Sequence, residues 1–269
     1  MIAPTSKSGS RTSDGARRAH VARKRFGQHF LHDPGILARL VAAIAPARAD
    51  AIVEIGPGEG TLTRALLEHV PHLAAIEIDR DLAARLAAEF PPERLTVYCA
   101  DALEFDFGAL SPGLRVVGNL PYNISTPLLF RLARFSDRVR DMLFMLQLEV
   151  VERMVARPST PAYGRLSVML QTRFAMQKLF RVPRGAFRPP PKVESAVVRL
   201  APLQTPIGCD ERQFEDTVRR AFSARRKTLR NALSLGAEDL SALGLDPRLR
   251  PENLSPDDYV RITRRLCAR

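Results

Sequence analysis

Cysteine is scarce in this sequence, and the few that occur are far apart. The three residues are Cys99, Cys209 and Cys267, an odd number without metal-ligand spacing. Neither a disulfide framework nor a zinc site is therefore expected, and a reducing compartment is favoured. The five histidines form no His-x-x-x-His or Cys/His cluster, so no bound metal is predicted. No apolar run approaches the roughly 18–20 residues that span a bilayer, and we expect a cytoplasmic chain without a membrane anchor.

Acidic residues are also in short supply relative to basic ones. The chain has 41 Lys and Arg against 29 Asp and Glu, a net charge of +12. Residues 50–114 hold 12 acidic and 4 basic residues, whereas residues 153–192 hold nine basic residues and no acidic one. A further basic cluster consists of Arg219, Arg220, Arg225, Arg226, Lys227 and Arg230. This segregation favours a polyanionic partner, because each neutralised phosphate releases condensed counterions; a solvated basic surface is the alternative.

The first 19 residues lack a hydrophobic period. They are rich in Ser, Arg, Gly and Thr, which predicts a disordered basic leader. A mitochondrial presequence is also rich in Arg and Ser, but this stretch carries Asp14 and shows no apolar face. It also lacks the apolar central region of a secretory signal. We therefore expect a flexible leader over residues 1–19 rather than a targeting signal.

From Asp33 onward the sequence alternates between helical and strand patterns. Asp33 can cap a helix in which Pro34 suits the first position, and short apolar runs then alternate with amphipathic stretches. The expected strands are 51–55, 73–78, 95–99, 116–119, 142–146 and 195–200, and the expected helices are 62–70, 81–90, 127–135 and 149–156. This alternation predicts an α/β fold, with a doubly wound, mostly parallel sheet and helices on both faces.

The strand patterns stop beyond residue 203. Residues 204–208 suit a linker, and residues 210–269 show helical spacing of their apolar positions. We therefore expect a larger domain over residues 20–203, followed by a small all-helical C-terminal domain over residues 204–269.

A glycine-rich segment, Glu54-Ile55-Gly56-Pro57-Gly58-Glu59-Gly60, lies where a strand turns into a helix. Glycines there let the backbone approach a ligand closely. Glu77 closes the next strand, where an acid can accept from both ribose hydroxyls. Asp101 follows the strand after that, where a carboxylate can accept from an adenine amino group. The turn alone would also suit a nicotinamide enzyme, but the two acids favour S-adenosylmethionine; solvated loop acids are the alternative.

The sharpest feature is Asn119-Leu120-Pro121-Tyr122, directly after a strand. The exocyclic amine of adenine is a poor nucleophile, because its lone pair is delocalised into the ring. Two acceptors on its N–H groups would expose that lone pair to a methyl donor. The side-chain oxygen of Asn119 and the backbone carbonyl of Leu120 or Pro121 could serve, and Tyr122 offers a face for stacking an extruded base. An ordinary turn is the alternative.

These residues resemble those of the ribosomal RNA adenine dimethyltransferase family. Phe26-Gly27-Gln28-His29-Phe30-Leu31 resembles the family's first cofactor motif, and Phe187-Arg188-Pro189-Pro190-Pro191-Lys192-Val193 its late substrate-side motif. The likeness extends from about residue 24 to the C-terminus. It implies a Rossmann-like methyltransferase that uses S-adenosylmethionine to dimethylate N6 of two adjacent adenines in small-subunit ribosomal RNA during ribosome maturation.

The resemblance also implies roles for individual residues. Cofactor contacts fall on His29, Leu31, Gly56, Glu77 and Asp101, and Asn119 lies between the methyl donor and the target amine. The family usually has Asn where this chain has His29, and an imidazole would make that contact sensitive to pH.

One further residue is placed by the same resemblance. Phe187 stacks on the target base opposite Tyr122, a role favoured by the Pro-rich and Arg-rich loop around it, which predicts an exposed ring. A core position for Phe187 is the alternative.

The helical tail carries the residues expected to bind RNA. Arg226 and Arg230 are four positions apart and share a helix face, and with Arg225 and Lys227 they form a row that can follow a phosphate backbone. A solvated helix face is the alternative. The expected partner is ribosomal RNA within the small subunit, and the chain is expected to be a monomer.

Three other functions remain for comparison. A DNA adenine methyltransferase also uses an Asn/Asp-Pro-aromatic loop, but this chain shows no large sequence-reading domain. A cytosine-C5 enzyme is disfavoured, because no cysteine lies near the acceptor loop. A non-catalytic RNA-binding factor, or a mitochondrial transcription factor of this fold, would be free to lose Asn119 or Glu77, and both are present.

Overall fold

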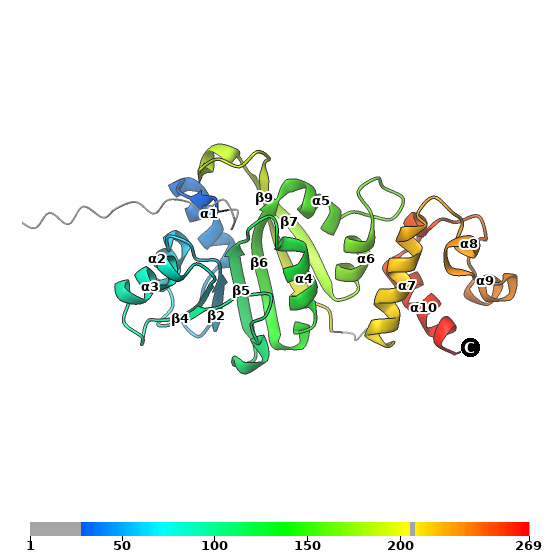
Figure 1. Cartoon of the computed structure of the whole chain (residues 1–269), viewed down its shortest axis with the longest axis horizontal. Helices are drawn as coiled ribbons and strands as arrows, with labels where there is room; N and C mark the ends of the chain where they lie inside the picture. The colour runs from blue at the N-terminus through cyan, green and yellow to red at the C-terminus, as the bar shows by residue number, and fades with distance from the viewer. Residues whose placement is uncertain (1–27, 205–207, 269) are drawn as a thin grey trace, which may run out of the picture.

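The computed structural model describes residues 28–204 and 208–268. The predicted leader over residues 1–19, Phe26 and Gly27, and most of the predicted linker lie outside the described residues. Figure 1 shows a central sheet with helices on both faces and a helical region beside it that ends at the C-terminus. The predicted order, an α/β part followed by an all-helical part, is confirmed.

The sheet has seven strands in the order β4-β3-β2-β5-β6-β9-β7. Their bounds are β2 Ile52–Ile55, β3 Leu73–Glu77, β4 Leu95–Cys99, β5 Leu114–Asn119, β6 Val139–Gln147, β7 Phe174–Val182 and β9 Ser195–Pro202. The first five strands in that order pair in parallel, and β9 pairs antiparallel with both β6 and β7, so β9 alone runs opposite to the other strands of this sheet. The predicted mostly parallel sheet is therefore confirmed.

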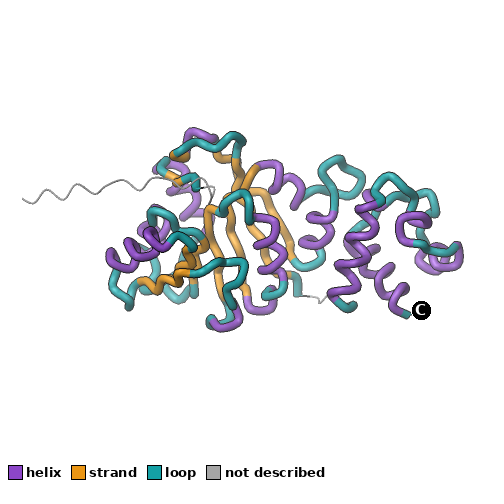
Figure 2. The backbone as a smooth tube through the Cα atoms, viewed as in Figure 1, coloured by secondary structure: helices purple, strands orange, loops and turns teal. Residues whose placement is uncertain are grey.

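Helices cover both faces of this sheet (Figure 2), and an apolar layer lies between the helices and the sheet on each face. Helices α1 (Pro34–Ile44), α2 (Thr61–Leu67) and α3 (Arg80–Glu89) pack on one face. Helices α4 (Ser125–Ala133), α5 (Leu148–Met154) and α6 (Arg165–Gln171) pack on the other. The side chain of Asp33 accepts from the Ile36 amide at 2.9 Å and Pro34 occupies the first turn, which confirms the predicted start of α1.

Four elements were not predicted from the sequence: β1 (Phe30–Leu31), α6, β7 and β8 (Phe187–Arg188). The apolar and polar residues of β7 do not alternate regularly. This strand lies at the edge of the sheet and exposes polar side chains such as Lys178 and Arg181. Helix α6 follows a turn-rich stretch and has only seven residues. Strands β1 and β8 form a separate two-stranded sheet between segments more than 150 positions apart, which no local pattern reveals.

The C-terminal helices are α7 (Glu211–Ser223), α8 (Leu229–Leu233), α9 (Ala237–Leu243) and α10 (Pro256–Cys267). Their apolar core is not theirs alone, since it includes Tyr163, Val168 and Met169 from the larger part of the chain. The Tyr163 hydroxyl donates to the Leu254 carbonyl at 2.8 Å, and both Tyr163 and Val168 are fully buried. The helical part is thus built onto α6 and the loop before it.

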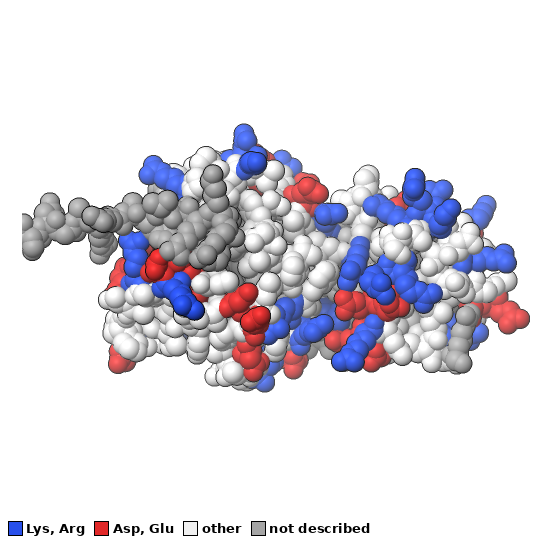
Figure 3. All heavy atoms as spheres, viewed as in Figure 1, with Lys and Arg blue, Asp and Glu red and all other residues white. Residues whose placement is uncertain are grey.

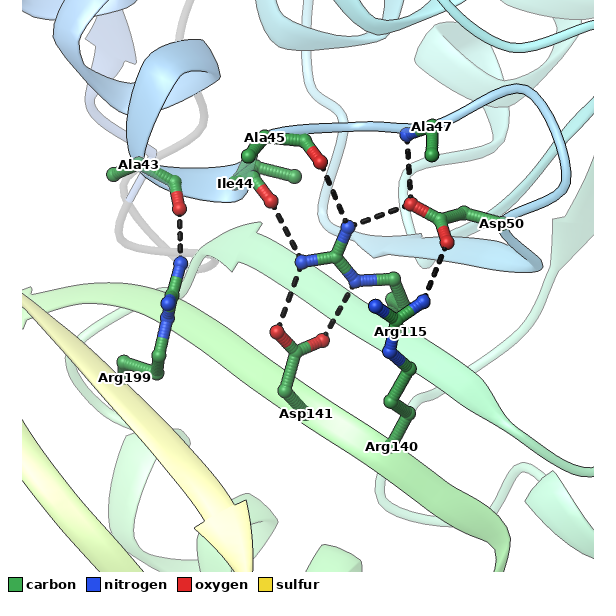
Figure 4. Close-up of polar contacts among 9 residues, drawn as sticks. All are labelled: Ala43, Ile44, Ala45, Ala47, Asp50, Arg115, Arg140, Asp141 and Arg199. Atoms are coloured by element: carbon green, nitrogen blue, oxygen red, sulfur yellow. Dashed lines mark hydrogen bonds and ion pairs between the residues drawn. The ribbon is translucent and has the colours of Figure 1, made fainter.

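A buried ion network attaches the C-terminal end of α1 to the sheet, near the amino ends of the parallel strands (Figure 4). Arg115, 5% exposed, pairs with Asp50 at 2.6 Å and with Asp141 at 2.8 Å. The same guanidinium donates to the carbonyls of Ile44 and Ala45 at 2.6 and 3.2 Å. These carbonyls end α1 and lack partners within the helix, so one arginine satisfies them and joins three elements.

Candidate active site

The candidate site lies where the order of the sheet reverses. Strands β2 and β5 are neighbours in space but not in sequence, and ligands of open α/β sheets bind outside the carboxyl ends of strands at such a point. A pocket of about 340 Å³ opens there. Its walls include the glycine-rich turn, Glu77, Asp101 and the acceptor loop that begins at Asn119, so the structure brings together the residues that the sequence singled out.

The glycine turn needs its glycines at two positions. Gly56 has a φ of +68°, a left-handed conformation, and a Cβ there would lie 3.8 Å from the Asn119 carbonyl oxygen. Gly58 has a φ of +57°, and a Cβ there would lie 3.0 Å from the ring of Phe30. Phe30 belongs to the predicted cofactor motif, so the turn and that motif are packed directly against one another.

Glu77 is held in a defined orientation at the pocket wall. It is 5% exposed, and its two oxygens accept from the amides of Gly58 at 3.1 Å and Asp79 at 2.9 Å. Burial raises the pKa of Glu77, and the two amides oppose that effect. Each carboxylate oxygen still has capacity to accept a hydroxyl, so the carboxylate can bind a diol from a fixed position.

Asp101 and Ile78 complete the wall beside Glu77. One oxygen of Asp101 accepts from the Leu103 amide at 2.8 Å, which leaves its other oxygen able to accept from a ligand. Ile78 is 42% exposed although it is large and apolar, and it lines the same pocket. An exposed apolar surface between two acids suits a flat ring with polar edges.

The pocket is strongly acidic. Glu54, Glu59, Glu77 and Asp101 line it, and no Lys or Arg is among its described lining residues. Glu54 is 2% exposed and accepts from the Thr63 hydroxyl at 2.6 Å. Burial raises its pKa to about 7, which the Thr63 contact opposes and the nearby Glu77 reinforces. Such a pocket favours a ligand with net positive charge.

Asn119 ends β5 at the mouth of the pocket, and its side chain is oriented by the backbone. Its Nδ2 donates to the His29 carbonyl at 2.8 Å, so its Oδ1 is left as an acceptor facing away from that bond. The Pro121 carbonyl accepts from the Ile124 amide at 3.2 Å and the Ser125 hydroxyl at 2.9 Å. Of the two carbonyls that could be the second acceptor, that of Leu120 is the one without a bond among the described residues.

Tyr122 forms the aromatic wall next to Asn119. Its hydroxyl lies 2.7 Å from the Ser195 hydroxyl, and its ring centroid is 5.6 Å from that of His29. Burial raises the pKa of Tyr122, an effect that Ser195 opposes. Nδ1 of His29 in turn donates a hydrogen bond to the Pro189 carbonyl oxygen at 2.8 Å. The cofactor motif, the acceptor loop and the substrate-side motif are therefore joined around one opening.

The expectation of an exposed Phe187 ring is wrong. Phe187 is 2% exposed and belongs to the apolar cluster beneath the site. It pairs across the two-stranded sheet with Leu31, which is 7% exposed. The loop around Phe187 is exposed at Arg188, but the ring itself points into the core, because pairing with β1 turns that residue inward. Stacking on a base would require the ring to leave this cluster.

The four tail residues predicted to bind RNA fall into two groups. Arg225 is partly buried, pairs with Glu252 and donates to the Pro161 carbonyl at 3.2 Å. Arg226, Lys227 and Arg230 are exposed, and none has an ion-pair partner among the described residues. Figure 3 shows clusters of Lys and Arg over this half of the molecule.

The cations of the predicted basic segment, residues 153–192, also divide into those that form ion pairs and those that do not. Five of its nine cations pair with carboxylates: Arg153, Arg165, Arg173, Lys178 and Arg181. Arg188 and Lys192 are exposed beside the candidate site and have no carboxylate partner within the described part of the chain. The charge available to a partner is therefore smaller than the sequence count indicates.

The structure adds site residues that sequence reasoning did not single out. Ile78 and Ser195 gave no signal, because an isoleucine at a strand end and a serine at a strand start are ordinary. Glu54 begins the glycine-rich segment. An acidic residue inside an otherwise apolar strand could have indicated a role in the binding site. Within residues 28–204 and 208–268, no group of three His, Cys, Asp or Glu side chains could hold a metal ion, and no helix is long and apolar enough to cross a membrane.

Comparison with known proteins gives consistent results. A family model described as ribosomal RNA adenine dimethylase matches residues 19–267. The chain is 60% identical over 254 residues to a ribosomal RNA small subunit methyltransferase A of Thiobacillus denitrificans, covering 93% of this chain and all of the relative. It is 58% identical over 254 residues to the protein of the same description in Aromatoleum aromaticum, covering 93% and 96%.

Two solved structures share the fold and much of the length. A dimethyladenosine transferase from Plasmodium falciparum superposes with a TM-score of 0.79 at 27% identity, covering 89% of this chain and 98% of the other. The 23S rRNA methyltransferase ErmE superposes with a TM-score of 0.65 at 26% identity, covering 88% and 99%. Both matches include the helical part as well as the sheet, since each covers nearly nine-tenths of this chain.

Proposed function

The chain belongs to the ribosomal RNA adenine dimethylase family, and from that premise we propose how its site performs the reaction. It is an S-adenosylmethionine-dependent methyltransferase that dimethylates N6 of two adjacent adenines in small-subunit ribosomal RNA during ribosome maturation. The observation that carries the mechanism is the orientation of Asn119, whose Nδ2 is committed to the His29 carbonyl.

That commitment matters because the target amine needs acceptors and not donors. With Nδ2 engaged, Oδ1 of Asn119 accepts one N–H of the adenine amine, and the free carbonyl of Leu120 accepts the other. Both contacts draw the nitrogen lone pair out of the ring and towards the methyl group. The nitrogen would form its bond to the methyl carbon as the S–CH3 bond of the sulfonium breaks and its electron pair returns to sulfur, which leaves as a neutral thioether. The methylated nitrogen would then release a proton to water, so the acceleration comes from positioning and preorganised acceptors rather than from a general base.

The aromatic wall positions the base for this step. Tyr122 is fixed through its hydroxyl on Ser195 and lies beside the His29 ring. A base extruded from its stack can lie on the Tyr122 face, an interaction worth roughly 1–3 kcal/mol per base. Pro121 makes the turn rigid and has no amide hydrogen to compete with the amine.

The residues of the pocket fit S-adenosylmethionine, which supplies an electrophilic methyl group when bound. Glu77 would accept from the ribose hydroxyls, and Asp101 would accept from the adenine amino group through the oxygen that does not bond to the Leu103 amide. Ile78 provides an apolar face for the purine, and Gly56 lets the backbone approach. The acids that line the pocket complement the positive charge of this cofactor, whereas a dinucleotide would bring its pyrophosphate against them.

The motif that precedes the sheet completes the cofactor site. His29 and Leu31 would contact the cofactor, and the packing of Phe30 on Gly58 keeps this motif against the glycine turn. His29 stands where the family usually has Asn. The backbone carbonyl of His29 orients Asn119, and any residue at this position would supply that carbonyl. The imidazole ring of His29 donates a hydrogen bond to the Pro189 carbonyl in the substrate-side loop.

The exposed tail cations Arg226, Lys227 and Arg230 bind phosphates of the small subunit, and Arg225 supports the loop at Pro161 that carries the tail. The residues beyond 204 thus form the RNA-binding part of a monomeric, cytoplasmic protein. The three tail cations are exposed without a carboxylate partner among the described residues, which supports this role for the tail. Arg188 and Lys192 are exposed cations of the same kind in the loop before β9, and they extend the basic surface into the methyltransferase part.

The test uses small ribosomal subunits that lack the modification. Purified protein is incubated with S-adenosylmethionine carrying a labelled methyl group and with undermethylated subunits, naked ribosomal RNA or duplex DNA. Label incorporated as N6,N6-dimethyladenosine in the subunits alone is expected. Incorporation into DNA would support a DNA adenine methyltransferase, and no incorporation into any substrate would support a non-catalytic RNA-binding protein.

A further inference from the structure

A second cavity lies beside the candidate site, on the face of the sheet covered by α4. It has a volume of about 560 Å³ and is formed by α4, the end of α6 and the first turns of α7. Figure 1 shows α4, α6 and α7 standing next to one another along this face. The cavity, called the α4–α7 groove below, therefore crosses from the methyltransferase part to the helical tail.

The groove begins where the cofactor pocket ends. Ala102 lines the pocket and the adjacent Leu103 lines the groove, in the same loop after β4. Ile124 lines the pocket and Pro127, in the first turn of α4, lines the groove. Two short stretches of chain thus separate the cavities.

Each acidic residue that lines the groove forms an ion pair with an arginine. Glu211 and Glu215 lie on α7 and line it. Glu211 pairs with Arg173 at 3.2 Å, and Glu215 pairs with Arg165 at 2.7 Å. Both ion pairs join α7 to α6 and its C-terminal end, so they serve to attach the tail and contribute little net charge.

Two other cations of the groove have no such partner. Arg134, just after α4, and Arg212, in the first turn of α7, are exposed, and neither side chain has a hydrogen bond or ion pair among the described residues. A third, Arg131, donates to the Phe105 carbonyl at 2.7 Å and remains a cation on the same wall. With the acids paired, the groove has a positive excess on its two facing helices.

Between these cations the wall is apolar. Phe130 is partly buried and Met169 is buried, and both line the groove. The guanidinium of Arg165 lies over the Phe130 ring, 5.5 Å from its centroid, which fixes that ring. Flat apolar surface flanked by free guanidinium groups matches a nucleotide, whose base stacks on aromatic side chains while its phosphate pairs with arginine.

We propose that the α4–α7 groove is a binding subsite for the single-stranded RNA next to the target adenine. Arg134 and Arg212 bind its phosphates, and Phe130 and Met169 contact its bases or riboses. The proposal rests on the proposed function, because it takes RNA to be the substrate. It also gives the attachment of α7 to α6 a role, since that packing and the two ion pairs place Arg212 at the groove.

The test compares three variants of the full-length protein: Arg134→Ala, Arg212→Ala and the double variant. Arg48→Ala is the matched control, because Arg48 is also exposed without a side-chain partner among the described residues and does not line either cavity. Binding is measured by fluorescence anisotropy with a labelled single-stranded oligoriboadenylate, over a range of salt concentrations. Methylation of undermethylated small subunits and calorimetry with S-adenosylmethionine are measured in parallel.

The double variant is expected to bind the oligonucleotide at least several-fold more weakly than Arg48→Ala. Its log–log salt slope should be smaller by roughly 0.7 for each phosphate that the variant no longer neutralises. KM for the subunits should rise with little change in kcat, and cofactor affinity should be unchanged. Phe130→Leu keeps the apolar volume but removes the flat ring, and it should weaken the oligonucleotide about fivefold or more without changing the slope.

Equal slopes and equal affinities in the double variant and Arg48→Ala would overturn the proposal. Adenosine monophosphate serves as a competitor, to distinguish a site for a free nucleotide from a site for nucleotides within an RNA strand. If it displaces the oligonucleotide from the wild type at equal molar concentration, and its own binding is lost in the double variant, the groove is a site for a free nucleotide and not for the RNA. Because oligonucleotide binding is read without catalysis, a wild-type protein that methylates no substrate would refute the proposed function and still leave the groove tested.

Discussion

The hydroxyl of Tyr122 lies 2.7 Å from the hydroxyl of Ser195, 73 positions further along the chain. Ser195 is fully buried and is the first residue of β9, two positions after the substrate-side motif ends. The aromatic wall of the acceptor site is therefore fixed by the loop that leads into the sheet and not by its own turn.

Removing either hydroxyl should slow methyl transfer to the same extent. Ser195→Ala and Tyr122→Phe each remove one hydrogen bond of about 1 kcal/mol, which corresponds to roughly a fivefold lower kcat. The double variant should be no slower than either single one, because both changes break the same hydrogen bond. Single-turnover methylation measures the rates. Additive reductions would mean that the two hydroxyls act separately.

Asn119→Ala should abolish most of the activity and leave the fold intact. Removal of one preorganised acceptor costs on the order of 10²–10³ in rate. Asn119→Asp is the informative companion, because a carboxylate cannot donate to the His29 carbonyl and so loses the orientation while keeping an acceptor. Thermal melting and cofactor calorimetry control for folding. Turnover like that of the wild type in a folded Asn119→Ala protein would refute the acceptor role.

Glu77→Ala should weaken S-adenosylmethionine binding and leave RNA binding nearly unchanged. Glu77 is oriented by the amides of Gly58 and Asp79 towards the pocket, where it is assigned to the ribose alone. Glu68→Ala, a change of an exposed acid on the same side of the sheet, is the control. Calorimetry gives the affinities, and equal binding by the Glu77 and Glu68 variants would leave Glu77 without a role in the cofactor site.

Glu54 should make the stability of the empty protein depend on pH. Burial raises its pKa from 4.5 to about 7, so between these values the folded state holds a proton that the unfolded chain has released. The free energy of unfolding therefore falls as the pH rises through this window. Glu54→Gln, which stays neutral, should remove that part of the fall. Urea unfolding at about pH 5 and about pH 8 measures it; unchanged pH dependence in the variant would contradict the prediction.

The tail should show two distinct effects. Replacing Arg226, Lys227 and Arg230 by alanine should lower affinity for the small subunit and reduce the log–log salt slope by roughly 0.7–0.9 for each phosphate left without its cation. Arg225→Ala should instead lower the melting temperature, because Arg225 joins Glu252 and the Pro161 loop. Cofactor binding should be unchanged in both. An unchanged slope and affinity in the triple variant would show that these cations form only a solvated surface.

The amino-acid sequence by itself determined the order of the elements and the chemistry of the acceptor loop. The start of α1 followed from Asp33 and Pro34, and the parallel sheet followed from short apolar runs separated by amphipathic stretches. The glycine turn, Glu77, Asp101 and Asn119 were found because each stands at the carboxyl end of a strand, a position that local pattern reveals. Residues at those ends converge in any doubly wound sheet.

Only the tertiary structure decided which distant residues touch. Phe187 and Arg188 are neighbours in one motif, yet pairing with Leu31 buries the first and exposes the second. Arg225 and Arg226 are neighbours too, and only the first meets Glu252. Likewise the α4–α7 groove exists because α7 is anchored on α6. Charge, exposure and cavity depend on contacts between segments far apart in the chain, and these are fixed by packing rather than by local sequence.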